Sequence, residues 1–349
     1  MECVLQRWRK RHCDGENFMK KQGWLAEFEA LRGLSIVLLL ILHSGILSLP
    51  FFGYSIAESS PYVKELLLGS FFFLAGYFFD MSWQKNKGGI LSFFQSRFLR
   101  IFPPYWISLW LFTLSYFLRK RDLFVYILNL QIIFSPVYVK QLLTLWYISL
   151  LVVFYLVFGI LVWKLRTNTQ LALGSAISCL ALYFLHRATG LFDPRFFVYF
   201  FIFVSGIFFF RFETIRTYLF SISFLSKSVL AAFGVASLWV VLAAEFKAPN
   251  ILYILGVDLF ILTWVLLWLS IFRTPIGNWK LWGFLSTASY IAYLLHRPIW
   301  EGARFYMQQV SWHDMIIFRA TLASVIILIL SYYLQLGYDR LLSSLNLKP

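Results

Sequence analysis

Long apolar runs recur along nearly the whole chain and constrain its fold more than any other feature. They lie at residues 32–52, 62–81, 97–118, 141–164, 169–187, 195–212, 224–245, 250–272, 282–301 and 315–337. About 20 apolar residues let a helix cross a bilayer, and in lipid each segment must satisfy its own backbone hydrogen bonds. We therefore predict an all-α fold, a polytopic membrane helix bundle of about ten transmembrane helices with no attached soluble domain. The interrupted segment 119–140 is expected to lie at the membrane interface.

The composition favours a membrane protein and argues against several other classes. With 60% hydrophobic and only 13% charged residues, a soluble chain could not bury so much apolar surface. The net charge of +15 is therefore expected to set topology and to attract anionic lipids or an anionic substrate rather than nucleic acid. Cys3, Cys13 and Cys179 show no metal-binding spacing, so we predict neither a metal site nor a disulfide framework.

The distribution of Lys and Arg predicts the orientation of the spans. With both termini in the cytoplasm, about 20 of the 31 Lys and Arg residues fall on the inner side, as the positive-inside rule requires. The basic cluster at 119–121 is the exception. The chain then divides into a basic cytoplasmic N-terminal segment (1–30), a transmembrane domain (31–340) and a short cytoplasmic tail (341–349). The polar N-terminal segment does not resemble a cleavable signal peptide.

One arginine and one histidine share a face of the first predicted helix. Arg32 and His43 are eleven residues apart, which places them within roughly 20° of one another and about 16 Å apart along a helix. Ionisable groups usually face a bundle interior or a wet cavity, so the pair is a candidate functional site. Alternatively, Arg32 anchors the helix at lipid headgroups and His43 is a hydrogen-bonded packing residue. Glu29, three residues before Arg32, can pair with it.

A second pair of cations lies at the start of the third predicted span. Arg97 and Arg100 are three residues apart and project from one side of a helix. Two guanidiniums held in this way can bind phosphate in bidentate fashion. Pro103 and Pro104 follow directly and are expected to break or kink the helix. The alternative interpretation is a positive-inside membrane anchor.

The ninth predicted span carries polar groups towards its outer end. Tyr293 and His296 share a helix face, and Arg297, Glu301 and Arg304 follow. This cluster suits the binding of a polar acceptor. It is equally consistent with an interfacial belt that contains an internal Arg–Glu pair.

Five segments of the chain together resemble a known family. FEALRGLSIVLLLILH is similar to the opening of the acyltransferase-3 family of membrane acyltransferases, in which a histidine follows an arginine by eleven residues. GSFFFLAGYFF, RFLRIFPPYW, LWYISLLVVFY and SYIAYLLHRPIW resemble further motifs in the family's order and spacing. Glu29 stands where an aspartate is usual, and Leu151 and Val152 stand where some members carry acidic residues.

The resemblance implies transfer of an acyl group, most often acetyl, from cytoplasmic acyl-CoA to a hydroxyl of a cell-surface or lipid-linked glycan such as lipopolysaccharide O-antigen. It also implies a multi-pass protein of the bacterial inner membrane, with acetyl-CoA as donor and no metal. The candidate residues are His43, Glu29 and Arg32 as the catalytic group; Arg97 and Arg100 as acyl-CoA ligands; and Tyr293, His296 and Trp146 as acceptor ligands.

The imidazole of His43 suits this chemistry on physical grounds. Histidine changes its charge near neutral pH, so His43 can take the proton of a sugar hydroxyl as that hydroxyl attacks the thioester, or accept the acyl group itself. We favour the role of general base, because no motif places a serine or cysteine nucleophile.

Two other classes of function compete with an enzyme. In a secondary transporter or flippase, Arg32, His43 and the intramembrane Asp258 would line a substrate or proton path. Transporters often contain internal repeats, and the first-span pattern is not repeated later in this chain. A non-catalytic membrane subunit is the second alternative, for which clustered intramembrane cations would be an unnecessary cost.

Overall fold

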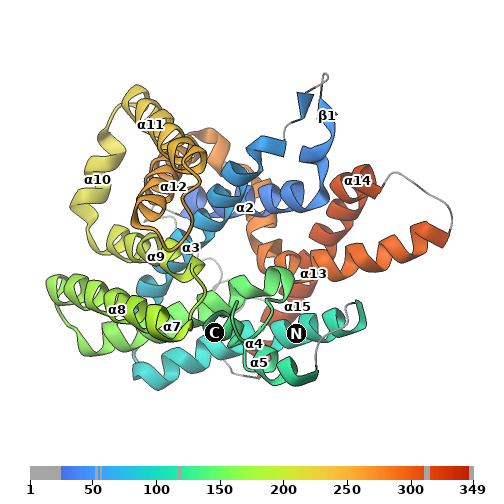
Figure 1. Cartoon of the computed structure of the whole chain (residues 1–349), viewed down its shortest axis with the longest axis horizontal. Helices are drawn as coiled ribbons and strands as arrows, with labels where there is room; N and C mark the ends of the chain where they lie inside the picture. Colours follow the sequence, from blue (N-terminus) through green and yellow to red (C-terminus); the bar gives the residue numbers. More distant parts are fainter. Residues whose placement is uncertain (1–24, 52–53, 56, 116–119, 310–314, 346–349) are drawn as a thin grey trace, which may run out of the picture.

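The computed structural model describes residues 25–51, 54–55, 57–115, 120–309 and 315–345. It confirms an all-α membrane helix bundle (Figure 1). Within the described residues, ten helices have 17 residues or more: α2 (Leu25–Ser44), α3 (Ser60–Lys85), α4 (Gly89–Ser115), α7 (Trp146–Lys164), α8 (Asn168–Thr189), α9 (Arg195–Arg211), α11 (Phe224–Ala243), α12 (Ile251–Phe272), α13 (Lys280–Gln309) and α15 (Ser324–Ser344).

Short elements connect these helices. They are the helices α5 (Leu123–Ile127), α6 (Gln131–Phe134), α10 (Glu213–Ser221) and α14 (Met315–Phe318), the tight turns η1 (Ile46–Ser48), η2 (Ala57–Ser59), η3 (Lys120–Asp122), η4 (Leu143–Leu145) and η5 (Pro275–Asn278), the π-helical turn η6 (Arg319–Ala323), and the antiparallel strands β1 (Pro50–Phe51) and β2 (Tyr54–Ser55). Residues 1–24 of the predicted N-terminal segment, with Cys3 and Cys13, and residues 346–349 of the predicted tail lie outside the described residues.

Six of the described helical segments are long and apolar enough to cross a membrane, and the pair α9 and α10, bent by 97°, would make a seventh. The predicted count of ten spans is therefore not confirmed. Among the long helices that do not meet this criterion are α2, α4 and α13. These three helices carry Arg32, Arg97 and His296, and their polar residues lower the mean hydropathy of the segments that hold the candidate site.

The first helix differs from its predicted range of 32–52. It begins at Leu25 and ends at Ser44, because Gly45 adopts a left-handed conformation with φ of 87° that stops the helix. His43 therefore lies in the last turn of α2 and not deep inside a span. An apolar count cannot detect this boundary, since the residues after Gly45 are also apolar.

Contacts between distant segments define two ends of the bundle. Gly33 of α2 faces Trp282 and Leu285 near the start of α13, whereas His43 meets His296 further along. The two helices, which lie near one another in Figure 1, therefore run parallel.

Helix α3 runs antiparallel to α2, because Phe28 stacks on Tyr77 at 4.3 Å between ring centroids. Helix α9 is parallel to α3, with Tyr199 bonded to Glu65 near their starts. We call the region of His43, His296, Glu65 and Tyr199 the histidine end, and the opposite region of Arg32, Arg97, Asp80 and Arg211 the arginine end. The predicted topology places the arginine end in the cytoplasm.

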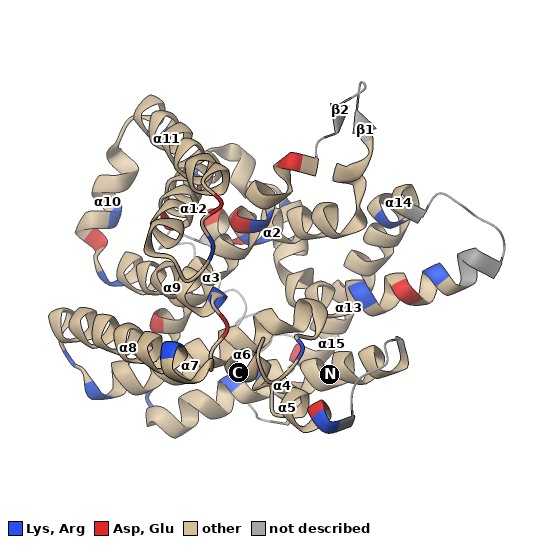
Figure 2. Cartoon of the chain, in the orientation of Figure 1, with Lys and Arg blue, Asp and Glu red and all other residues tan. Residues whose placement is uncertain are grey.

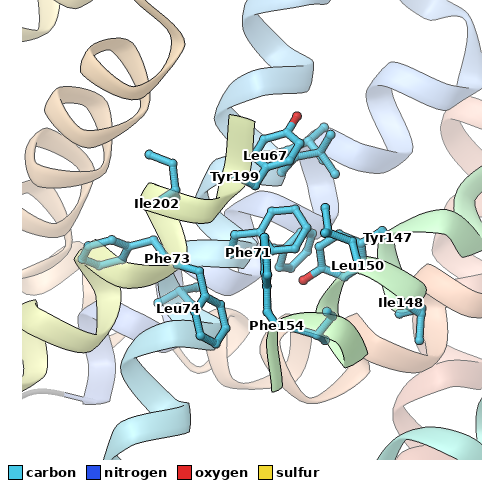
Figure 3. Close-up of a cluster of buried hydrophobic side chains, with 14 of the residues drawn as sticks. Leu67, Phe71, Phe73, Leu74, Tyr147, Ile148, Leu150, Phe154, Tyr199 and Ile202 are labelled. Carbon is cyan, nitrogen blue, oxygen red and sulfur yellow. The ribbon is translucent and has the colours of Figure 1, made fainter. Parts of the chain in front are cut away.

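The backbones of α3 and α9 touch at two glycines. A Cβ atom on Gly76 would overlap the carbonyl oxygen of Phe203, and one on Gly206 would overlap that of Phe73. Small residues permit this closeness between membrane helices. Figure 3 shows the buried side chains of α3, α7 and α9 around this region, including Phe154 of α7, whose ring centroid is 5.2 Å from that of Phe203.

Charged residues are sparse along the long helices and gather near helix ends and connections (Figure 2). The main exception at the arginine end is a buried ion pair. Arg211 donates to both carboxylate oxygens of Asp80, at 2.9 and 2.7 Å, and to the side-chain oxygen of Asn168 at 3.1 Å. Asp80 is fully buried, so this fork satisfies a carboxylate that would otherwise be costly in the bundle.

Helix α4 continues through Pro103 and Pro104 to Ser115, so of the two outcomes predicted there, a break or a kink, the break does not occur. Proline has no backbone N–H, and Pro103 therefore leaves the carbonyl of Leu99 without its helical partner. The hydroxyl of Tyr338 in α15 donates to that carbonyl. A side chain from another helix thus replaces the lost bond, as is common where proline lies within a membrane helix.

Candidate active site

His43 and His296 come together at the histidine end. Nδ1 of His43 lies 2.9 Å from Nε2 of His296, and the two rings are nearly parallel, with an interplanar angle of 4° and centroids 5.1 Å apart. His296 is fully buried, whereas His43 is only partly buried. Two histidines that are 253 positions apart in sequence therefore form one hydrogen-bonded dyad.

The hydrogen bonds of the dyad define its proton positions. A charged imidazole would be costly in this buried position, so we infer that each ring carries a single proton. Nδ1 of His296 lies 2.8 Å from the carbonyl oxygen of Tyr293, which can only accept. Nδ1 of His296 must then donate and its Nε2 must accept, so Nδ1 of His43 donates. Nε2 of His43 is left with an unshared lone pair.

A proline in α13 helps to hold this arrangement. Pro298 lies inside the helix and removes the backbone donor that would pair with the carbonyl of Leu294. The buried hydroxyl of Ser108 in α4 donates to this carbonyl at 2.8 Å. The backbone one turn before the proline is thereby tied to α4 beside His296.

Tyr293 is also held by a neighbouring segment. Its hydroxyl donates to the carbonyl of Thr144 in η4, and its ring centroid lies 5.0 Å from that of Tyr147 and 6.0 Å from that of His296. Only 4% of Tyr293 and none of His296 is exposed. The polar atoms of both side chains are hydrogen-bonded within the bundle, and direct contact of either with an acceptor stays a prediction.

Trp146 occupies a different place, at the start of α7 and beside α9. The guanidinium of Arg195 lies 3.9 Å from the centroid of the Trp146 ring. Arg195 also forms a fork with Asp193, with bonds of 2.8 and 3.0 Å to its two carboxylate oxygens. The indole is partly buried. Trp146 is thus less buried than Tyr293 and His296, and its role as an acceptor ligand stays a prediction.

The three predicted arginines converge at the arginine end. Arg97 lies over the rings of Phe93 and Tyr155, at 5.2 and 5.4 Å, and interacts electrostatically with Arg100. Arg32 interacts with Arg100 and Tyr155 as well. The Nη2 atom of Arg97 makes one long bond, 3.5 Å, to the carbonyl of Phe78. Its buried Nε atom has no hydrogen-bond partner among the described residues.

Glu29 does not pair closely with Arg32. Within the described residues no ion pair of 4.0 Å or less joins them, and the exposed carboxylate attracts the guanidinium only at longer range. The residue two positions earlier, Glu27, is the buried one, and it lies 3.7 Å from Arg273. The spacing of three residues indicated a possible pair, but the two side chains face different neighbours.

Several polar contacts were not evident from the sequence. Glu65 lies near Asp258 and interacts with it electrostatically, so the intramembrane Asp258 has a carboxyl neighbour and not a cation. The Glu301–Arg304 pair forms at 2.7 Å, and an internal Arg–Glu pair was part of the alternative interpretation of this cluster as an interfacial belt. The sequence signal for the contact between Glu65 and Asp258 was an acidic residue, Glu65, directly before an apolar run. Within the described ranges, no three His, Cys, Asp or Glu side chains gather in a metal-binding arrangement.

Comparison with known proteins adds one finding to this geometry. A family model described as "Acyltransferase domain", of the family Acyl_transf_3, matches residues 25–336. The match begins at Leu25, the first residue of α2, and extends into α15. A search of curated proteins and a search of solved structures returned no match.

Proposed function

Because the chain belongs to the acyltransferase-3 family, we propose that it transfers an acyl group, acetyl in the first instance, from acyl-CoA to a hydroxyl of a cell-surface or lipid-linked glycan. The protein is an acyltransferase by family, and its apolar helices indicate a membrane protein. The donor, the acceptor and a bacterial inner membrane location with cytoplasmic termini are parts of the proposal.

The observation that carries the proposal is the Nε2 atom of His43, which has no hydrogen-bond partner among the described residues. With one proton on each ring, the hydrogen bonds of the dyad favour the proton of His43 on Nδ1, which makes Nε2 an acceptor beside the buried His296. A general base needs such a nitrogen within reach of the proton that it abstracts. His296 acts as a positioning residue, comparable to the groups that fix the tautomer of a catalytic histidine in other acyl-transfer sites.

The proposed reaction is a single transfer step from the donor thioester to the acceptor hydroxyl. The acceptor hydroxyl oxygen attacks the carbonyl carbon of the thioester while Nε2 of His43 takes the hydroxyl proton. A C–O ester bond forms, the C–S bond breaks, and His43 returns the proton to the departing thiolate, which leaves as the thiol of CoA.

The arginine end suits the other half of the donor. Acyl-CoA carries several phosphates, which we propose are bound by Arg97 and Arg100, with Arg32 nearby. The unused Nε of Arg97 supports this assignment, because a buried guanidinium without its full set of bonds gains from an anionic ligand. Glu29 would orient Arg32 at longer range.

A series of pairwise contacts joins the two ends of the bundle. Arg32 interacts with Tyr147, the Tyr147 ring lies beside Tyr293, and Tyr293 lies beside His296. Arg32 and His43 are about 16 Å apart along α2. We propose that the acyl-pantetheine arm of the donor follows this tyrosine-lined route, with the nucleotide held at the arginine end and the thioester at the histidine end.

Glycan labelling tests the proposal. Membranes that contain the protein are supplied with radiolabelled acetyl-CoA and with glycan isolated from cells that lack the protein. Label should enter the glycan, and its mass should rise by one acetyl group per modified unit. Removal of the unrelated histidine by His186→Ala serves as a matched control and should leave the labelling in place. If no glycan or lipid acquires label, the proposal is wrong and a transporter becomes the better interpretation.

A further inference from the structure

A second feature of the histidine end is a cavity that the reaction chemistry does not use. It has a volume of about 410 Å³ and lies among the starts of α3, α9 and α12 and the connection after α11. Pockets of this size commonly hold small molecules or parts of larger ligands. Its polar lining includes Lys64, Glu65, Arg195, Tyr199 and Tyr253.

The polar wall of the cavity is held in place by buried contacts. Glu65 is only 2% exposed, and its carboxylate accepts a bond of 2.7 Å from the Tyr199 hydroxyl and pairs with Lys64 at 2.8 Å. Tyr253 interacts with the same carboxylate. A carboxylate, two phenols and an ammonium therefore surround one small volume. These groups can accept from and donate to the hydroxyls of a sugar.

The charges of the lining nearly cancel. Lys64 is paired with Glu65, and Arg195 is paired with Asp193, which is not among the lining residues. The rim adds one charge of each sign, Glu245 and Lys247. A phosphorylated ligand would find no excess of cations here, unlike at the arginine end. An uncharged, hydroxyl-rich ligand matches the cavity better.

Aromatic side chains connect the cavity to the dyad. Arg195 lines the cavity and lies over Trp146, and the next residue, Tyr147, is in ring contact with Tyr293. Tyr293 in turn contacts His296. Three aromatic side chains thus separate the cavity from the dyad at the same end of the bundle. A glycan chain of several sugars is the kind of acceptor that can reach both.

We propose that this cavity binds uncharged sugar units of the acceptor that are remote from the hydroxyl being acylated, with Trp146 between the two positions. This inference rests on the proposed function. It makes Tyr253 and Lys247 determinants of acceptor affinity that take no part in the chemistry, and it makes the enzyme favour long glycan chains over single sugars.

The test compares acceptors of different length in two mild variants. Tyr253→Phe removes one hydroxyl, and Lys247→Gln changes an exposed rim residue, so both are expected to fold. The probes are the glycan isolated from cells lacking the protein and the methyl glycoside of the sugar found to be acylated. KM for the long glycan should rise about fivefold in either variant, as for one lost hydrogen bond. KM for the methyl glycoside, KM for acetyl-CoA and kcat should not change.

A matched control and two contrary outcomes complete the experiment. Lys85→Gln neutralises an exposed lysine at the arginine end and should leave every constant unchanged. Unchanged KM for the long glycan, or an equal rise for both acceptors, would overturn the inference and leave the proposed function standing. If the unmodified protein acylates neither acceptor, the proposed function is wrong and this inference falls with it.

Discussion

At the arginine end, the guanidinium of Arg97 makes one long hydrogen bond and keeps a buried Nε atom without a partner among the described residues. At the histidine end, three of the four ring nitrogens of His43 and His296 have partners. The two regions lie at opposite ends of α2, yet their hydrogen bonding differs. The Arg97 guanidinium has an unused buried donor, whereas the dyad of His43 and His296 has a nearly complete set of hydrogen bonds with one free acceptor.

The difference indicates a division of labour. Unused buried donors are costly in an apolar bundle unless a ligand satisfies them, which suits the binding of an anion. A network with one free acceptor suits a group that must act in a fixed orientation, because catalytic groups gain from positions set before the substrate arrives. Changes at the histidine end should therefore alter kcat, and changes at the arginine end should alter KM for the donor.

The largest effect is expected for His43→Ala. It removes the only free acceptor of the dyad, and general base catalysis contributes about 10² to 10⁴-fold, so kcat should fall by about 10³-fold. KM for acetyl-CoA should stay nearly constant, since the arginine end is unchanged. Steady-state kinetics on protein of matched abundance measures both constants. A kcat near the wild-type value would show that His43 is not the general base and that the two ends do not divide the work in this way.

His296→Ala should come next, with kcat reduced by about 10 to 100-fold, a range within the effects of outer-shell orienting groups. The change leaves Nδ1 of His43 without its acceptor and releases the ring. His296→Gln should restore part of the activity, because the amide oxygen can accept the same bond. Equal losses in both variants would indicate a packing role for His296 and not the orientation of His43.

Arg97→Gln should raise KM for acetyl-CoA by about tenfold, which corresponds to one lost charge-assisted hydrogen bond, with kcat little changed. Arg100→Gln should act in the same direction but less, because Arg100 is more exposed. Acetyl-pantetheine lacks the nucleotide phosphates, so neither change should affect its KM. Arg166→Gln, on an exposed arginine between α7 and α8, is the matched control. A penalty that persists with acetyl-pantetheine would contradict phosphate binding.

The smallest effect is expected for Ser108→Ala, which leaves the buried carbonyl of Leu294 without a partner. Stability should fall by about 1 to 3 kcal/mol, and kcat should fall only slightly. Ser35→Ala is the control, because the hydroxyl of buried Ser35 bonds to a carbonyl, that of Leu31, within its own helix. Thermal unfolding in detergent compares the two. Equal shifts of the unfolding temperature in the two variants would show that the bond from Ser108 to Leu294 has no special role in stability.

Much of the fold followed from the apolar runs. The helical class and most helix ranges, such as 224–245 against Phe224–Ala243, could be predicted because membrane helices must satisfy their own backbone. The first helix was displaced because its end depends on the conformation of Gly45 and not on hydropathy. Of the break or kink predicted at Pro103, the break is absent for another reason. A hydroxyl from α15, distant in sequence, supplies the missing bond.

The candidate site could be predicted only in part. Arg32 and His43 were identifiable because their spacing lies within one helix. The contact between His43 and His296 was not, since it depends on how α2 packs on α13 and no local pattern encodes it. Glu27 shows the same limit: its pairing with Arg273 requires the packing of α2 near η5. The residue types were enough to identify candidate site residues, but the partners of these residues depend on the tertiary packing.

The glycine contact between α3 and α9 has a consequence for motion. With Gly76 against Phe203 and Gly206 against Phe73, neither backbone can slide along the other without steric overlap. The two helices must therefore travel as a single rigid body, which carries the part of the cavity lining that α3 and α9 supply together with the buried Asp80 fork. Entry and release of substrates then require the remaining helices, α13 among them, to shift against this unit.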